Sequence, residues 1–570
     1  MGKVDLVIRG GTVFDGSGGP SFEADIAVDG DRIVGIGKVA ASGRDEIDAR
    51  GRIVTPGWVD IHTHYDGQAT WDRHMTPSSN LGATTVVMGN CGVGFAPVRP
   101  SDHETLIRLM EGVEDIPGAA LHEGLSWKWE SFPDYLDALD ALPRDIDVAA
   151  QVPHGALRVY VMGERGAKRA PATAEEIARM GELVRDSIRA GALGFSSSRT
   201  LIHRTSDGDL TPTVRAEREE MMGIAEGMRQ AGAGVFQFAS DFEDLDREFD
   251  LFCEMNRHSG RPLSFSLVEA ETLPGQWRTL LSKLEGANAQ GYDIKAQVAA
   301  RPVGLMLGMQ GSIHPFVNRP SYMEIADRPL ADRLAIMADP AFRARLLAEE
   351  GLQGHPFVNF MAGAWHKMFE LGTPPNYEPS PDQSVAARAA AAGRSPQDLV
   401  YDFLLADEGR GFLYFPFLNY AQADLENVRT MLTHPHTLLG LSDGGAHCGV
   451  ICDASLNTTM LTHWVRDRSR GPRMRLEDVV RRMTSSTADF FGFPDRGRLQ
   501  AGKKADVNVI DFDGLHLHAP KMIFDLPAGG RRLVQKVDGY DMTICSGTPI
   551  FEKGEETGAR PGKLVRSQAD

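Results

Sequence analysis

Apolar and polar residues alternate over short segments in the first fifty residues of the chain. Apolar side chains at every second position are typical of a half-buried strand, and glycine-containing pairs between such segments indicate turns. The expected strands are 4–9, 12–14, 24–28 and 32–37, with turns at Gly10-Gly11 and Asp29-Gly30-Asp31. No helical pattern occurs here, so this part of the chain predicts a small antiparallel sheet.

The pattern changes near Trp58, where short apolar strands begin to alternate with longer amphipathic segments. The expected strands are 84–88, 147–152, 234–239, 263–267 and 437–441, and the expected helices include 174–190, 215–231 and 478–491. Strand–helix alternation of this length indicates a parallel sheet with crossover helices. Eight such units would close a barrel whose chemistry lies on the loops that follow the strands.

Two further segments complete the expected organisation. Residues from about 301 to 394 break the alternation with Pro, Gly and aromatic residues, which indicates an insertion over the active face of the barrel. Strand patterns return at 505–510, 532–537 and 542–545. We therefore expect an α/β protein: a (β/α)8 TIM-like barrel over 57–496 with an insertion at about 301–394, and a small β-sandwich domain formed from both termini, 1–56 and 497–570.

Composition and charge narrow the range of partners. The 570 residues include 60 Lys and Arg against 78 Asp and Glu, a net charge of −18, which argues against a nucleic-acid or anionic membrane partner. Five thinly spread cysteines do not form a disulfide framework. No apolar run of eighteen residues and no signal-peptide pattern is present. We expect a cytoplasmic protein, with formation of a homo-oligomer left open.

A pair of histidines follows the first apolar strand of the barrel region. Asp60-Ile61-His62-Thr63-His64 puts two imidazoles two residues apart, and residues i and i+2 of a strand face the same side. Two neutral imidazoles on one face can bind a divalent metal together. The alternative is a pair of unrelated surface or capping histidines. The flanking Thr55-Pro56-Gly57 and the apolar character of the strand favour the metal pair.

A cysteine and an aspartate follow two other strands. Cys91 lies in Gly89-Asn90-Cys91-Gly92, where a thiolate could serve as a metal ligand, although a buried inert thiol is the alternative. Asp443 precedes two glycines, where its carboxylate could act as general base and then general acid, although a turn or helix-capping aspartate is the alternative. The combination with the histidine pair favours a catalytic metal site.

These segments resemble the amidohydrolase superfamily, and within it the N-acyl-D-amino-acid deacylase (D-aminoacylase) branch. The motifs that carry the resemblance are 5–12, 56–64, 89–92, 154–158, 191–194, 442–444 and 497–506. The resemblance implies a metal-dependent (β/α)8 barrel with a small β-sandwich built from both termini. It also implies hydrolysis of an amide-type bond with the help of zinc, as one or two divalent ions.

The resemblance also implies roles for individual residues. His62 and His64 match the metal-binding pair, and Cys91 matches the cysteine that this branch uses where other amidohydrolases have a carboxylated lysine. Asp443 matches the aspartate that takes a proton from the metal-bound water. His154 matches a histidine of the branch, with Pro153 in place of the usual glycine, and is a candidate substrate-binding residue; local packing is the alternative.

The chain departs from the branch after the fifth and sixth barrel strands. The branch has a metal-binding histidine at each place, and an arginine for the substrate carboxylate after the fifth, whereas this chain reads 236–241 and 264–268 without histidine. Three explanations remain open: a mononuclear site held by His62, His64, Asp443 and Cys91, loss of activity, or replacement by other residues. The candidates for replacement or substrate binding are His203, Asp241 and His366.

The sequence thus predicts a zinc-type hydrolase of a non-peptide amide or related C–N bond in a small acylated or amide substrate. A metal-bound water would attack the carbonyl, with Asp443 as general base and then acid. Hydrolysis of a lactone, cyclic amide or N-formyl compound on the same scaffold is one alternative. A metal-free, non-catalytic homologue is the other.

Overall fold

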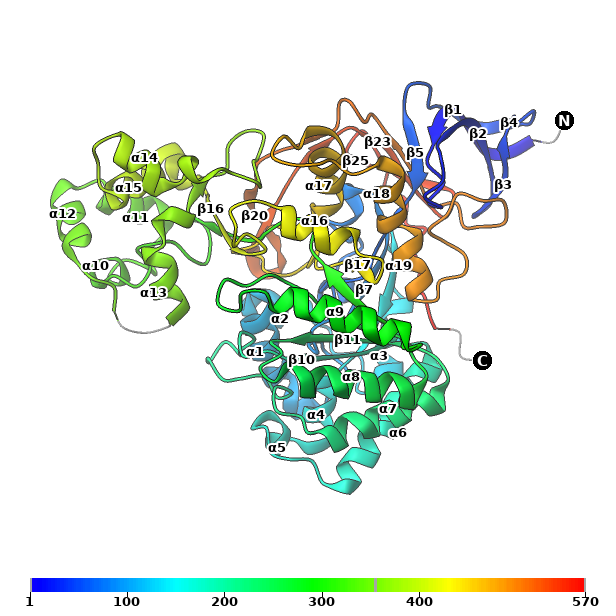
Figure 1. The fold of residues 1–570 in the computed structure, drawn as a ribbon, viewed down its shortest axis with the longest axis horizontal. Helices are drawn as coiled ribbons and strands as arrows, with labels where there is room; N and C mark the ends of the chain where they lie inside the picture. Colours follow the sequence, from blue (N-terminus) through cyan, green and yellow to red (C-terminus); the bar gives the residue numbers. More distant parts are fainter. Residues whose placement is uncertain (1–2, 353–355, 568–570) are drawn as a thin grey trace.

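The computed structural model describes residues 3–352 and 356–567 of the chain. Figure 1 shows three parts: a central barrel, a sheet that carries the N-terminus at the upper right, and a helical insertion on the left. All five cysteines are free. Within the described ranges, no helix has both the length and the apolar character needed to cross a membrane.

The described residues contain eight parallel strand positions that form a closed barrel. In barrel order they are β6 (Trp58–Asp60), β7 (Ala83–Met88), β8 (Asp147–Ala150) continued by β9 (Val152–Pro153), β10 (Gly194–Arg199), β11 (Val235–Ser240), β12 (Leu263–Ser266), β13 (Ile294–Val298) and β17 (Thr437–Leu439). The ring closes where Thr63, after β6, pairs in parallel with Gly444, after β17. Nearly all strand residues are buried, as expected for a parallel sheet covered on both faces. The expected (β/α)8 barrel is confirmed.

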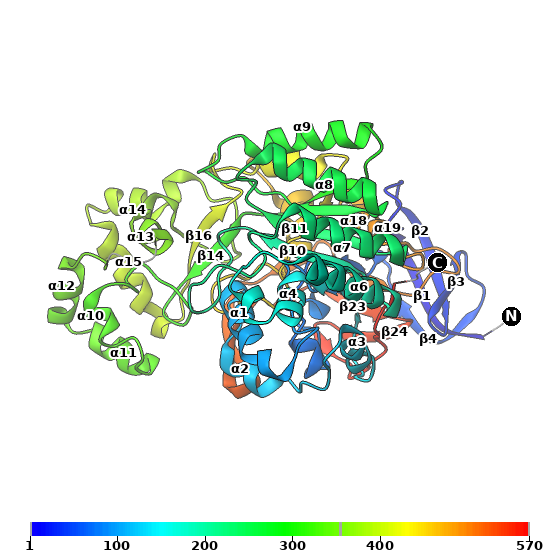
Figure 2. The same ribbon diagram turned by 90° about the horizontal axis from the view of Figure 1, so that it is seen from below.

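Helices surround the barrel, and Figure 2 shows α6, α7 and α8 next to one another on its outside. The bounds are α1 (His103–Glu114), α2 (Gly118–Gly124), α3 (Phe132–Asp140), α4 (His154–Met162), α5 (Glu164–Ala167), α6 (Ala174–Ala190), α7 (Arg218–Ala231), α8 (Leu245–Ser259), α9 (Gln276–Ala289), α16 (Glu426–Thr433), α17 (Leu456–Thr459), the π-helix η7 (Met460–Asp467), α18 (Leu476–Met483) and α19 (Ser485–Phe490). The predicted helix 174–190 is confirmed at both ends. The single helix predicted at 478–491 is wrong, because Thr484 leaves the helical conformation at φ −130° and ψ −87°.

Strands from both termini form a nine-stranded sheet beside the barrel. They are β1 (Lys3–Val13), β2 (Phe22–Asp29), β3 (Arg32–Gly37), β4 (Ser42–Asp48), β5 (Ile53–Pro56), β18 (Val507–Ile510), β23 (Tyr540–Cys545), β24 (Thr548–Glu552) and β25 (Glu555–Glu556). Their apolar faces enclose a core that includes Ile26, Val507 and Ile544, so strands from both termini share one sheet and one core. The turn predicted at Gly10-Gly11 is wrong, because β1 passes through it with a β-bulge.

The chain between β18 and β23 forms two small two-stranded sheets. They consist of β19 (His516–Leu517) with β22 (Val537–Asp538), and β20 (Lys521–Leu526) with β21 (Gly530–Val534). The strand predicted at 532–537 is therefore divided between β21 and β22. The Leu533 amide donates to the Cys448 carbonyl, so this segment reaches the loop that follows the last barrel strand.

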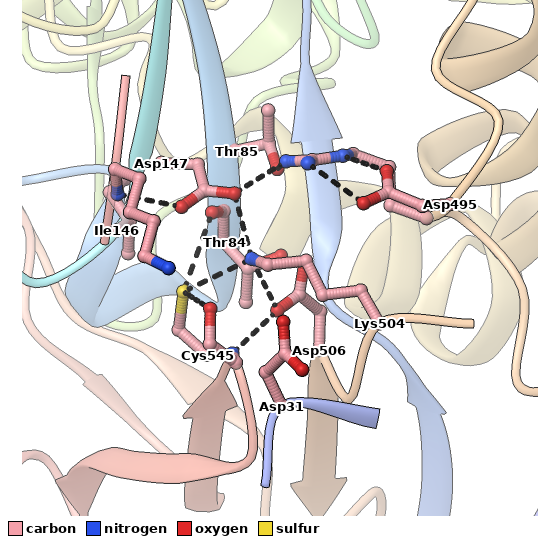
Figure 3. A network of polar contacts seen from close by, with 12 residues as sticks. Asp31, Thr84, Thr85, Ile146, Asp147, Asp495, Lys504, Asp506 and Cys545 are labelled. Carbon is pink, nitrogen blue, oxygen red and sulfur yellow. Dashed lines mark hydrogen bonds and ion pairs between the residues drawn. The ribbon is translucent and has the colours of Figure 1, made fainter. Parts of the chain in front are cut away.

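A buried network of charged residues joins the barrel to the terminal sheet. Asp147, the first residue of β8, accepts from Arg496 at 2.6 Å and from Lys504 at 2.7 Å. Lys504 also binds Asp506 at 2.9 Å and lies 3.7 Å from the Cys545 sulfur (Figure 3). Burial by itself would raise the pKa of Asp147, but the two cations lower it. The carboxylate is therefore ionised, and it connects segments almost 360 residues apart.

The insertion between β13 and β17 is a small helical subdomain with a core of its own. Its elements are β14 (Val303–Leu307), α10 (Pro320–Met323), α11 (Leu330–Met337), α12 (Pro340–Ala348), α13 (Pro356–Gly363), β15 (Phe369–Glu370), α14 (Val385–Ala391), α15 (Pro396–Leu405) and β16 (Leu413–Leu418). β14 and β16 pair antiparallel at its base, so the excursion extends beyond the expected 301–394. Ser312 and Met306 bind the backbone of Gly449 and Val450, which anchors the insertion beside the loop after β17.

Candidate metal centre

The loops that follow β6, β7 and β17 bring four of the predicted residues together at the carboxyl end of the barrel. One ring nitrogen each of His62 and His64 and the sulfur of Cys91 lie within 4.8 Å of one another. Oδ1 of Asp443 lies 3.3 Å from Nε2 of His62 and 3.5 Å from Nε2 of His64. The loop of Asp443 is fixed to the histidine pair, because the Asp443 amide donates to the His62 carbonyl and the His64 amide donates to the Gly444 carbonyl.

His62 is held in one orientation by a residue of the seventh barrel strand. Its Nδ1 is 2.7 Å from Oε1 of Gln297 on β13, and the Gln297 amide nitrogen donates to Ser264 of β12 at 3.0 Å. Burial lowers the pKa of His62 to about 4, so the ring is neutral, with Nδ1 as the donor to Gln297. Nε2 then carries the lone pair, and it faces Cys91 and Asp443. This is the form in which an imidazole binds a metal.

The ring of His64 lies between two carboxylates, with Asp443 next to its Nε2 and the buried Glu114 next to its Nδ1. Its Nδ1 is 3.3 Å from Oε1 of Glu114, the last residue of α1, and both side chains are at most 2% exposed. Among the described residues, both ring nitrogens of His64 and Oε1 of Glu114 lack a hydrogen bond of good geometry. Buried polar groups in proteins are nearly always hydrogen-bonded or bound to an ion. The donor set therefore fits a divalent cation.

Cys91 completes the donor set from the end of β7. Its amide donates to Oε1 of Gln237 at 2.9 Å, and its sulfur lies 3.4 Å from Nε2 of His62. Burial raises the pKa of the thiol to about 11, with an opposing hydrogen bond from His64. A cation in this position would favour the thiolate, as in other metal–cysteine sites.

The backbone is strained where these side chains converge. Four non-glycine residues here adopt left-handed φ values: Cys91 at 55°, Leu441 at 59°, Asp443 at 49° and His447 at 52°. Each such residue costs about 1 kcal/mol or more, and such residues cluster at functional sites. His447, four residues after Asp443, points its Nε2 to Oε2 of Glu114 at 3.5 Å. Neither Glu114 nor His447 was predicted as a site residue; Glu114 has no local sequence signal, whereas His447 lies next to the Ser442-Asp443-Gly444 motif.

The two segments that lack the expected histidines, 236–241 and 264–268, contribute neutral polar residues here. Gln237 on β11 and Ser264 on β12 are fully buried, and they bind Cys91 and Gln297 respectively. Asp241 accepts from the Thr200 hydroxyl at 2.5 Å and from the Leu201 amide at 2.7 Å, so it fixes the loop after β10. That loop carries His203, whose pKa is lowered to about 3 by burial and by the nearby His447 and His64.

The other two predicted residues lie outside this group. His154, the first residue of α4, is fully buried, with Nδ1 2.8 Å from the Ser197 hydroxyl and Nε2 2.8 Å from Glu220. Both ring nitrogens are engaged, so we do not include His154 in the proposed site. His366 lies exposed on the short helix η4 (Trp365–Lys367) of the insertion. The neighbouring Lys367 binds Glu271 after β12 at 2.6 Å, which is a further contact between insertion and barrel.

Comparisons with known proteins agree with this architecture. The sequence profile of the amidohydrolase family matches residues 45–551. A D-aminoacylase of Alcaligenes xylosoxydans xylosoxydans is 29% identical, over 99% of this chain and 98% of the relative. An N-acyl-D-glutamate deacylase of the same organism is 28% identical, over 100% of this chain and 97% of the relative.

A solved structure shows the same likeness. It is the structure of a D-aminoacylase with a binuclear metal centre, 25% identical, covering 99% of this chain and 100% of the other, with a TM-score of 0.65. The shared fold, the motifs at the strand ends and the family match agree. The chain belongs to the amidohydrolase family, in its D-aminoacylase-like branch, and is a hydrolase of carbon–nitrogen bonds other than peptide bonds.

Proposed function

We propose that this protein is a divalent-metal-dependent, zinc-type deacylase that hydrolyses the amide bond of an N-acyl amino acid or a closely related compound. The observation that carries the proposal is the convergence of His62, His64 and Cys91 within 4.8 Å, next to Asp443. Two imidazoles, a thiolate and a carboxylate are a donor set that suits zinc. Relatives along the whole chain are named for deacylation of D-amino acids.

The residues of the chain have separate tasks in this reaction. His62, His64, Cys91 and Asp443 would hold a cation that polarises the substrate carbonyl and lowers the pKa of water toward neutrality. Gln297 keeps Nε2 of His62 unprotonated. Asp443 is 15% exposed, so its carboxylate can accept a proton from water and return it to the leaving nitrogen. Burial by itself would raise the pKa of Asp443, but the nearby rings of His64, His62 and His447 lower it by more than burial raises it. The carboxyl group is therefore ionised before the reaction and can act as a base.

A substrate without a free carboxylate is the second candidate. The segment 236–241, in which the branch carries an arginine for the substrate carboxylate, contains no arginine. The Asp241 carboxylate is already bound to Thr200 and Leu201, and it adds negative charge there. This difference favours a neutral amide, cyclic amide, lactone or N-formyl compound.

The test is turnover of a substrate panel by wild type and Asp443→Asn. The panel contains N-acyl-D-amino acids, formamides, cyclic amides and lactones, each assayed with added zinc. We expect Asp443→Asn to keep the wild-type melting temperature and to lower kcat by at least about a thousandfold, because the proton acceptor is lost. Asp382→Asn, an exposed position in the insertion, is the control and should retain full activity. Near-wild-type turnover by Asp443→Asn would refute the role of this carboxylate.

A further inference from the structure

We propose that a cavity at the amino end of the barrel, opposite the candidate metal centre, binds a phosphate-bearing small molecule. The cavity has a volume of about 750 Å³. Its walls are the starts of β11, β12, β13 and β17, together with α18, α19 and the segment up to residue 496. Both helices contact β17 (Figure 1). The inference is independent of the proposed function, because none of the proposed metal ligands lines this cavity.

Positive charge is concentrated in this cavity, although the whole chain has a net charge of −18. Seven Arg and Lys side chains line it, against three Asp side chains. Two of these carboxylates are already paired, Asp489 with Arg498 at 2.6 Å and Asp495 with Arg496 at 3.0 Å. The lining cations that form no ion pair among the described residues are Arg261, Lys295, Arg481 and Arg482.

Arg482 on α18 is the cation that most needs an anion. It is only 8% exposed, and the one hydrogen bond of its side chain among the described residues is long, 3.5 Å from Nη1 to the Thr437 carbonyl. Burial and the adjacent Arg481 lower its pKa to about 10, so the guanidinium is still charged at neutral pH. A buried cation without a counter-charge is costly. An anion in the cavity would supply that charge.

Two further cations reach the cavity from neighbouring barrel strands. Lys295 lies two positions before Gln297 on β13, and Gln297 faces the barrel interior, where it binds His62. The Lys295 side chain therefore points into the same interior at the opposite end of the strand. Arg261, before β12, donates through Nη1 to the Gly232 carbonyl, while its buried Nε has no partner among the residues that the structure describes.

The unpaired cations and the size of the cavity together favour a phosphate ester. Guanidinium groups bind phosphate oxygens through two parallel hydrogen bonds, and an ammonium group adds a point charge. Small-molecule sites have volumes of about 300–1,000 Å³, so this cavity has room for an organic group beside the phosphate. Barrel enzymes carry their chemistry at the carboxyl end. The ligand is therefore distinct from the substrate of the proposed hydrolase.

The experiment is calorimetric titration of the zinc-loaded protein at constant ionic strength. The probes are inorganic phosphate, ribose 5-phosphate and adenosine monophosphate, with ribose as the phosphate-free control. The variants are Arg482→Met and Lys295→Met, and the matched control is Arg345→Met, whose side chain is 53% exposed in the insertion. We expect wild type and Arg345→Met to bind one equivalent of a phosphate probe with a Kd below about 1 mM and not to bind ribose. Each cavity variant should bind at least about tenfold more weakly.

A melting experiment separates a ligand-binding role of Arg482 from a structural one. Methionine has a similar size and removes the uncompensated charge, so Arg482→Met should melt at or above the wild-type temperature in phosphate-free buffer. Ribose 5-phosphate should raise the melting temperature of wild type and leave that of Arg482→Met unchanged. A lower melting temperature combined with unchanged phosphate affinity would mean that Arg482 is structural, and would overturn the proposal. If Arg482→Met does not fold, Lys295→Met decides.

Three other results would overturn the proposal. The first is a wild type that binds none of the three phosphate probes. The second is equal affinity in wild type and both cavity variants, which would place the phosphate elsewhere, such as at the metal centre. The third is binding that appears only in Asp570→Asn, because the carboxylate of Asp570, which lies outside the described residues, would then be the anion of the cavity. None of these results bears on the proposed function, which is measured by hydrolysis.

Discussion

The contact between His62 and Gln297 shows how a neutral residue can determine the chemistry of a ligand. Nδ1 of His62 can donate to the amide oxygen of Gln297 at 2.7 Å, while the Gln297 amide is itself held by Ser264. Residues that orient a ligating histidine typically contribute ten- to a hundredfold in metal affinity. Gln297 is therefore expected to position His62 without touching the substrate.

Replacement of Gln297 by leucine tests this role. Gln297→Leu keeps a side chain of similar size but removes the acceptor, so His62 can take the wrong tautomer. We expect zinc affinity to fall by about ten- to a hundredfold, measured by competition with a chromogenic chelator. Gln290→Leu, an exposed position after α9, is the control and should bind zinc as wild type does. Unchanged affinity in Gln297→Leu would mean that His62 is oriented by the strand alone.

At the residue scale, the sequence reveals the proposed ligands that stand in short motifs and misses the residues whose place in the site depends on the fold. His62, His64, Cys91 and Asp443 could be predicted because each directly follows an apolar strand. Glu114 ends an amphipathic helix that carries no motif, and Gln297 lies in a strand that the pattern did not single out. Their importance comes from contacts across 50 to 235 positions, which no local pattern records.

At the scale of single elements, capping residues define α6. Thr173 accepts from the Glu176 amide and Glu176 accepts from the Thr173 amide, a capping box that satisfies two free amides of the first turn. Gly191 ends the helix at φ 119°. The amphipathic pattern that predicted this helix therefore ends at residues that favour both of its boundaries.

The cap makes a quantitative prediction. Thr173→Ala should lower the free energy of unfolding by about 1 kcal/mol, because one amide of the first turn loses its acceptor. Chemical denaturation monitored by circular dichroism measures the difference. Thr173→Ser retains the hydroxyl and should be close to wild type. A loss in Thr173→Ser as large as that in Thr173→Ala would show that the methyl group, and not the cap, stabilises the helix.

The break between α18 and α19 illustrates the opposite case. No glycine or proline separates the two helices, so the pattern at 478–491 indicates one continuous helix. The Thr484 hydroxyl donates to the Val480 carbonyl at 2.6 Å, and the Ser485 hydroxyl donates to the Gly16 carbonyl at 2.6 Å. The second contact joins positions 469 residues apart. Tertiary hydrogen bonds thus override local helix preference here.

At the scale of the whole molecule, the domain order could be predicted because the two kinds of periodicity differ. The alternating pattern at both ends and the strand–helix pattern between them correspond to the terminal sheet and the barrel. The helical character of the insertion could not be predicted. Its short helices, such as α10 and α14, are separated by proline- and glycine-containing turns and are stabilised by a shared core.

The connection between the barrel and the terminal sheet is testable through Asp147. Asp147→Ala removes the carboxylate that Arg496 and Lys504 share. Arg496 keeps its ion pair with Asp495, and Lys504 keeps its ion pair with Asp506. We expect a loss of about 3 kcal/mol in the free energy of unfolding. Because the pKa of Asp147 is lowered, this contribution is complete above about pH 4 and is lost as the pH falls further.

The control for this position is an exposed ion pair. Asp5 contacts Arg44 with side chains 42% and 66% exposed, so Asp5→Ala should cost less than about 1 kcal/mol. Denaturant unfolding of both variants near neutral pH gives the comparison. Equal losses would mean that the buried network does not stabilise the junction.

The central claim is that a metal held by His62, His64, Cys91 and Asp443 makes this protein a hydrolase. The most direct test is hydrolysis of N-acyl-D-amino acids and neutral amides by one preparation as purified, after removal of metal with a chelator, and after addition of zinc, with elemental analysis at each stage. The account predicts at least one equivalent of metal, loss of activity on its removal and recovery with zinc. Activity that persists without metal, or a protein that binds no zinc and gains no activity from it, would contradict the account.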